Sequence, residues 1–179
     1  FLTYANILDK SELYCYGLGN RNKIDNCGVM IYQSMSGDAA DGTGVLNCVD
    51  SSLEILKDSS VYSTAPMFFI TNTKAVINLQ DCRIKYGSKI FLDIKGTTEW
   101  GNEGSNGGEV TLNLNNQEIE GNINVDGISS LSIVLKNSKI TGTINGSKSA
   151  KSLSISLDSK STITLTGNSY YTSLTNEIS

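Results

Sequence analysis

The chain has 179 residues, enough for one domain with a continuous hydrophobic core. Its net charge of −4, its sequence pI of about 4.8 and its lack of histidine exclude the basic footprint of a nucleic-acid-binding protein. No stretch approaches the roughly 20 consecutive apolar residues of a membrane-spanning helix, so we expect no membrane insertion.

The first 23 residues are the least regular part of the chain. They begin at Phe1, show no signal peptide, and lack the repeat that follows. We expect an incomplete first coil or a cap over residues 1–23, and we expect the chain to be a piece of a longer protein.

A six-residue frame recurs from residue 24 onward. Each copy begins and ends with an apolar residue or cysteine and has Asn or Asp third. The copies are IDNCGV (24–29), CVDSSL (48–53), LQDCRI (79–84), LNNQEI (114–119) and LKNSKI (135–140), and a longer copy, LDSKSTI (157–163), has Ser159 in that place. The third positions are 24, 31, 35, 21 and 22 residues apart. A period of 21–24 residues with insertions indicates a solenoid.

The segments that precede the frame alternate strictly between apolar and polar residues. This holds for EVTLNL (109–114), SLSIVL (130–135) and SLSISL (152–157), and it is typical of strands with one buried face. No window of useful length has the 3.6-residue period of a helix. The sequence therefore predicts an all-β parallel β-helix of about six coils, with regular coils over 24–168 and a closing segment over 169–179.

The third position of the frame has a structural explanation. A tight bend between two strands needs a residue that tolerates the left-handed region, and stacked amides can hydrogen-bond from coil to coil. We expect a structural ladder at one corner, with a metal site along it as the alternative. The predicted ladder residues are Asn26, Asp50, Asp81, Asn116 and Asn137.

The cysteines are expected to be buried thiols. In this frame Cys27 and Cys82 share a column two coils apart, roughly 9–10 Å, whereas a disulfide requires Cα atoms within about 7 Å. Cys48 falls in a core column with Leu79. A zinc site would need paired ligand spacing, and a catalytic thiol would need a base such as histidine.

The corner residues, the coil length and the Val/Ile/Thr alternation resemble right-handed parallel β-helices of the pectin-lyase-like type. More closely, VMIYQSMSGDAADGTG (29–44), FFITNTKAVINL (68–79) and the stretch 107–137 resemble bacterial adhesin-like surface proteins with β-helix repeats. The resemblance covers about residues 24–175. It implies an extracellular protein, secreted or attached to the cell surface, but the fold hosts lyases, hydrolases and binding modules alike.

Two insertions, 34–44 and 96–108, are predicted to project from the same side of the solenoid. Their acids are calcium ligands by type, so the insertions predict a Ca²⁺ site. The predicted metal ligands are Asp38, Asp41, Glu99 and Glu103. An exposed indole can stack on a sugar ring beside amide and carboxylate groups. The predicted glycan-binding residues are Trp100, Asn102, Asn106 and Glu109. Plain surface loops, with Trp100 folded back over an apolar edge, are the alternative.

We expect a non-catalytic domain that binds a polysaccharide, or a host-surface glycan or protein. Lyases of this fold typically combine calcium-bound acids with a basic residue, and the arginines here are Arg21 and Arg83, the latter in the corner frame. A pectin-lyase-like lyase or hydrolase is the first alternative, and a structural stalk is the second. Open strand edges at the ends of the solenoid also predict end-to-end self-association.

Overall fold

The computed structural model describes residues 4–19, 26–33 and 42–176, and the described residues are all-β, with no helix among them. The strands are β1 (Tyr4–Ile7), β2 (Glu12–Cys15), β3 (Val29–Tyr32), β4 (Thr43–Val49), β5 (Ser52–Ile55), β6 (Phe68–Thr71), β7 (Thr73–Gln80), β8 (Arg83–Lys85), β9 (Ile90–Ile94), β10 (Gly108–Asn115), β11 (Glu118–Glu120), β12 (Asn122–Val125), β13 (Ser130–Lys136), β14 (Lys139–Gly142), β15 (Ser152–Leu157), β16 (Thr162–Leu165) and β17 (Ser173–Asn176).

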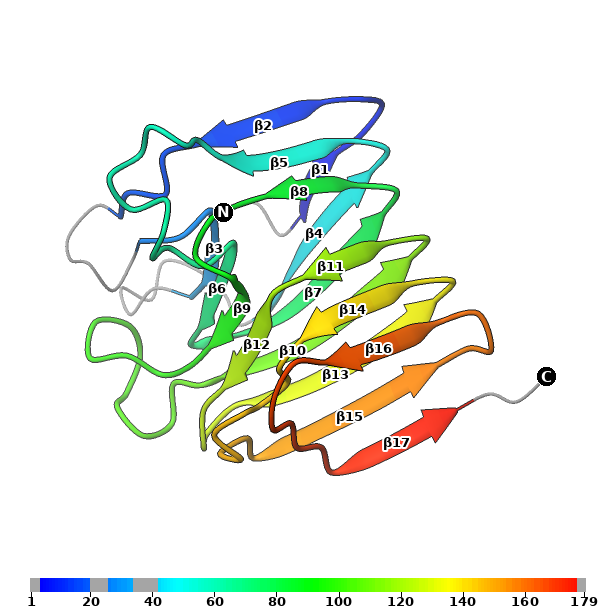
Figure 1. Cartoon of the computed structure of the whole chain (residues 1–179). Helices are drawn as coiled ribbons and strands as arrows, with labels where there is room; N and C mark the ends of the chain where they lie inside the picture. The colour runs from blue at the N-terminus through cyan, green and yellow to red at the C-terminus, as the bar shows by residue number, and fades with distance from the viewer. Residues whose placement is uncertain (1–3, 20–25, 34–41, 177–179) are drawn as a thin grey trace.

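All strand pairs are parallel, and they form four sheets. Sheet A has the order β1-β4-β7-β10-β13-β15-β17, sheet B β2-β5-β8, sheet C β12-β9-β6-β3 and sheet D β11-β14-β16. The chain passes from sheet A through sheet B or D, and in its first four passes through sheet C, before it returns to sheet A beside its previous strand. We call each such passage a circuit. Figure 1 shows the circuits succeeding one another from the blue β1 and β2 to the red β17.

The core lies inside these circuits because alternate residues of each sheet A strand point inward. In β10 and β13 the buried positions alternate with half-buried or exposed ones. Leu112 pairs with Ile133, and each is fully buried. Burial of such a side chain contributes about 1.5–3 kcal/mol, so these rows hold adjacent circuits together. The strands predicted at 109–114, 130–135 and 152–157 are confirmed.

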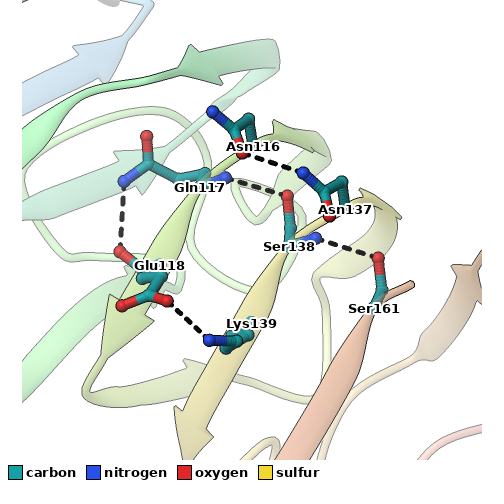
Figure 2. Close-up of polar contacts among 7 residues, drawn as sticks. All are labelled: Asn116, Gln117, Glu118, Asn137, Ser138, Lys139 and Ser161. Atoms are coloured by element: carbon teal, nitrogen blue, oxygen red, sulfur yellow. Dashed lines mark hydrogen bonds and ion pairs between the residues drawn. The ribbon is translucent and has the colours of Figure 1, made fainter.

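The corner after sheet A turns through left-handed residues. Their φ angles are 45° at Asp50, 54° at Asp81, 48° at Asn116 and 46° at Asn137. Asn and Asp adopt this region more readily than other residues with a side chain. Figure 2 shows the amide of Asn137 donating to the Asn116 Oδ1 at 2.9 Å, and Asn116 in turn donates to Asp81. This set of four residues is the corner ladder.

A second, buried column lies one residue further along. The Gln117 N–H donates to the Ser138 Oγ and the Ser138 N–H to the Ser161 Oγ, each at 3.0 Å (Figure 2). The Cys82 N–H donates to the Gln117 Oε1 at 2.8 Å. Each side chain therefore accepts a backbone N–H from the preceding circuit, which satisfies a donor that would otherwise be buried without a partner.

The structure places two predicted members of these columns elsewhere. Asn26 and Cys27 lie just before β3 of sheet C, and the Asn26 side chain accepts the Gly19 N–H at 2.9 Å. The predicted frame treated 24–29 as a corner, but β4 pairs with β1, so the residues beside Asp50 belong to the turn after β1. There Lys10 donates its N–H to the Asp50 carbonyl at 2.8 Å. The first circuit was not recognised in the sequence because its strands β1, β2 and β3 are short and irregularly spaced.

The last corner differs from the others because it carries one extra residue. The register resumes at Lys139, which pairs with Thr162. Asp158 takes over the capping role, since its carboxylate accepts the Asn137 N–H at 3.1 Å and the Ser161 hydroxyl at 2.6 Å. These hydrogen bonds, led by that from Ser161, lower the pKa of Asp158 below its ordinary value.

Candidate functional site

A groove of about 650 Å³ lies where the chain passes from sheet C into sheet A. It crosses the first residues of β4, β7, β10 and β13, beside both insertions. Its lining is polar, apart from glycines and one isoleucine: Gln33, Gly42, Thr43, Asn72, Thr73, Lys74, Ser105, Gly107, Gly108, Glu109, Ile128, Ser130 and Lys151. We call it the loop groove.

A row of polar side chains crosses the groove from strand to strand. Thr43 pairs with Lys74, Lys74 with Glu109, and Glu109 with Ser130. Neighbouring strands are about 4.8 Å apart, so the row offers donors and acceptors at that interval. The Lys74 ammonium lies 3.4 Å from the Glu109 carboxylate, and their side chains are 63% and 68% exposed. Both groups therefore remain accessible to solvent, and Glu109 is one of the predicted glycan-binding residues.

Asn72 lines the groove and links the second insertion to Gln33, the residue before the first insertion. It has a φ of 51° between β6 and β7. Its side-chain amide donates to the Gln33 carbonyl and its backbone N–H to the Asn106 carbonyl, each at 2.8 Å. Sequence reasoning did not single out Asn72, although an Asn between two apolar alternating runs is typical of a left-handed turn.

Asn106 holds the second insertion together from inside. It is 1% exposed, and its Nδ2 donates to the carbonyls of Thr97 and Trp100 at 2.5 Å each. Asn106 was predicted to contact a glycan, but its burial places it beneath the surface. Asn102 and Asn106 lie in the same polar, glycine-rich insertion, so the sequence does not distinguish them. In the folded loop Asn102 is exposed and Asn106 is buried.

Trp100 folds back against the end of β3. Its ring centroid lies 4.5 Å from that of Tyr32, with the planes inclined at 48°. Trp100 is half-buried and Tyr32 is 38% exposed, so the pair presents an aromatic edge. The residue after Tyr32, Gln33, accepts a hydrogen bond from the Asn72 side chain. The residue after Trp100, Gly101, packs closely against the same side chain. The aromatic pair therefore borders the loop groove.

The predicted metal ligands fall into two groups. Asp38 and Asp41 lie outside the described residues. Glu99 is half-buried and Glu103 is exposed on the second insertion, as is Asn102. Across the described part of the chain, no three Asp, Glu, Cys or His side chains gather closely enough to hold a metal ion.

A second groove, of about 510 Å³, follows the outer face of sheet A. An amide ladder crosses it, in which Asn113 donates to Asn78 at 2.8 Å, Asn78 to Asn47 at 2.7 Å and Asn47 to Asn6 at 2.8 Å. These amides satisfy one another along the row. The row contains no charged side chain. This second groove lies further along the sheet A strands than the loop groove does.

A third groove, of about 880 Å³, lies over β8, β11 and β14. Two of its lysines form ion pairs, Lys139 with Glu118 at 2.8 Å and Lys85 with Glu54 at 3.3 Å. Tyr86 donates its hydroxyl to the Glu120 carbonyl at 2.5 Å, and burial, followed by the charge of Glu120, raises the pKa of that phenol. The loop groove is the better candidate because described residues of both insertions line it and an aromatic pair lies beside it.

Comparison of the chain with family models, with curated protein sequences and with solved structures gave no match. None of the described segments forms a helix with the length and apolarity of a membrane span.

Proposed function

We propose that the chain is a right-handed parallel β-helix of about six coils, of the pectin-lyase-like type, and that it serves as a non-catalytic binding domain of an extracellular, adhesin-like surface protein. Two features support the β-helix. Each circuit returns to sheet A beside its predecessor, and the left-handed ladder turns the same corner in successive circuits.

Its ligand is a glycan that lies along the loop groove. The observation that carries this proposal is the Tyr32–Trp100 pair beside the polar row of Thr43, Lys74, Glu109 and Ser130. Sugar rings offer apolar C–H faces to aromatic side chains and hydroxyls to polar groups. A row repeating at about 4.8 Å suits an extended polymer better than a compact small molecule.

The charged residues that line the groove indicate which class of glycan it suits. Among the described lining residues there are two lysines, Lys74 and Lys151, and one carboxylate, that of Glu109. Lys74 is paired with Glu109, which leaves Lys151 as the further cation among the lining residues that the structure describes. A neutral or mildly acidic polysaccharide fits this balance.

Affinity electrophoresis through gels containing individual polysaccharides tests the proposal, with Ca²⁺ and again with EDTA. We expect one or more glycans to retard the chain, and we expect Trp100→Ala and Lys74→Ala to reduce the retardation several-fold. Tyr171→Ala is the matched control, since Tyr171 is a 52% exposed aromatic residue near the C-terminal end. Circular dichroism verifies that each variant is folded.

The same gels separate the alternatives. Retardation that disappears with EDTA adds the calcium site to the proposal, with Glu99 and Glu103 as the acids to replace first. A retained glycan that is shortened during the run indicates a lyase or hydrolase instead. No retardation by any glycan overturns glycan binding and leaves a protein-binding adhesin or a stalk.

A further inference from the structure

The amide ladder of the second groove uses only part of its own hydrogen-bonding capacity. A primary amide has two N–H donors and two acceptor lone pairs. Asn47 and Asn78 each donate one N–H to the preceding circuit and accept one N–H from the following circuit. Each of them therefore keeps one N–H and one lone pair outside the ladder. Both side chains are half-buried and line the second groove, on the outer face of sheet A.

The ladder also has a direction and a definite end. Every amide in it donates toward β1, so the amide dipoles add head to tail. The ladder ends at Asn113, because Asn113 pairs with Val134 of β13 and valine has no side-chain donor. A shorter row beside it repeats the arrangement, since Asn115 donates to Gln80 in the same direction at 3.1 Å. The second groove therefore offers an oriented array of amide donors and acceptors.

The surroundings of the ladder are almost uncharged and partly apolar. Among the described residues that line the second groove, Lys136 is the one charged side chain, whereas the loop groove has three. Leu8, Val49 and Val134 line the second groove beside the amides. A ligand that fits this groove is therefore neutral, and it combines amide groups with small apolar groups.

The spacing of the ladder favours a polysaccharide over a peptide. The ladder amides recur at about 4.8 Å, the interval between strands, whereas the residues of an extended peptide recur at about 3.3 Å. The strands β4, β7 and β10 are paired on both sides, so a peptide finds no open strand edge there. An acetamido substituent on a sugar ring has one N–H, one carbonyl and one methyl group. These match the remaining lone pair, the remaining N–H and the apolar residues of the groove.

We propose that the second groove is a further binding site, which takes an uncharged N-acetylated polysaccharide through its amide ladder. The acetamido N–H donates to an amide oxygen of the ladder, and the acetamido carbonyl accepts the remaining N–H of Asn47 or Asn78. The methyl group packs against Val49 or Val134. This site is separate from the loop groove, so it neither requires nor excludes the glycan proposed there.

Isothermal titration calorimetry of the full chain tests the proposal with soluble oligomers of equal length. The chitin oligomer has an acetamido group on each ring, the cellulose oligomer has a hydroxyl in its place, and the glucosamine oligomer has a charged amine. We expect the chitin oligomer to bind, and the other two to bind at least about tenfold more weakly because they lack the amide. Equal binding of the chitin and cellulose oligomers, or no binding of the chitin oligomer, would overturn the proposal.

Variants distinguish the two grooves. Asn78→Leu interrupts the ladder and should weaken binding of the chitin oligomer by about tenfold. Val134→Asn supplies a donor to Asn113 and extends the ladder by one circuit, so it should strengthen binding, a gain that misfolding cannot produce. Thr111→Val, on the same strand as Asn113 but outside the groove, is the matched control. Trp100→Ala should also bind like the wild type. A loss in Trp100→Ala without a loss in Asn78→Leu would assign the oligomer to the loop groove and overturn the second site alone.

Discussion

At the scale of single residues, Asp158 is a carboxylate whose charge stabilises a corner of the fold. Its carboxylate accepts hydrogen bonds from the Ser161 hydroxyl and from the backbone of Asn137 and Lys160, which lower its pKa below 3.8. A depressed carboxyl pKa stabilises the folded state above the unfolded-state value, and that stabilisation is lost as the pH falls through the folded-state value. We therefore expect Asp158→Asn to be less stable than the wild type at neutral pH and nearly equal to it well below pH 3.8.

Urea unfolding at a series of pH values measures this difference. Asp58→Asn, which changes an exposed aspartate on another loop, is the control and should follow the wild type throughout. A gap between Asp158→Asn and the wild type that stayed constant down to the lowest pH would contradict an electrostatic role for Asp158.

At the scale of elements, the corner ladder combines backbone conformation with amide pairing, and substitutions at Asn116 separate the two. Ala at a φ of 48° carries a left-handed penalty of about 1–2 kcal/mol and also loses the hydrogen bonds to Asp81 and Asn137. Gly tolerates the same φ and loses only those bonds. We expect Asn116→Ala to lower the free energy of unfolding by more than Asn116→Gly, and urea titration measures both. Equal losses would mean that the conformation contributes little.

The same elements show how far the sequence could be read. Strict alternation located β10, β13 and β15 to within a residue or two at each end, because each buries one complete face. It could not locate β3, which has only four residues. The segment IDNCGV (24–29), which leads into β3, has the same residue pattern as the corners. Local sequence gives the preference for a turn, but the partner strand determines which turn it is.

The sequence likewise predicted only part of the candidate site. Both insertions were expected to leave from one side, and their described ends line a single groove. Asn72 and Tyr32 were not singled out, since neither differs in type from many neighbours. Their importance comes from contacts with residues 34 or more positions away in the chain, which no local pattern encodes.

At the scale of the whole molecule, sheet A ends at β1 and β17, whose outer edges have no strand partner among the described residues. Large apolar side chains are exposed at both ends, with Tyr14 at 49%, Leu165 at 52% and Leu174 at 48%. Unpaired edges beside apolar surface favour strand addition. We propose that copies of this chain associate end to end, and we expect the sedimentation coefficient to rise with concentration.

Substitutions at one end test this association. Leu174→Lys places a charge on the exposed end of the core, and Thr175→Pro removes an N–H from β17, so both should reduce association. Ser132→Lys, on the outer face of the central strand β13, is the control. A chain that sediments as a monomer at every concentration would exclude the interaction.

The measurement that most directly tests the central claim, that a glycan binds along the loop groove, is the fluorescence of Trp100 during titration with a glycan that retards the chain. Trp100 is the sole tryptophan, so its emission reports on the groove edge alone. We predict a saturable change in emission that Lys74→Ala weakens and Tyr171→Ala leaves unaltered. Constant Trp100 emission through a titration in which the glycan demonstrably binds would place the binding surface elsewhere and contradict the account.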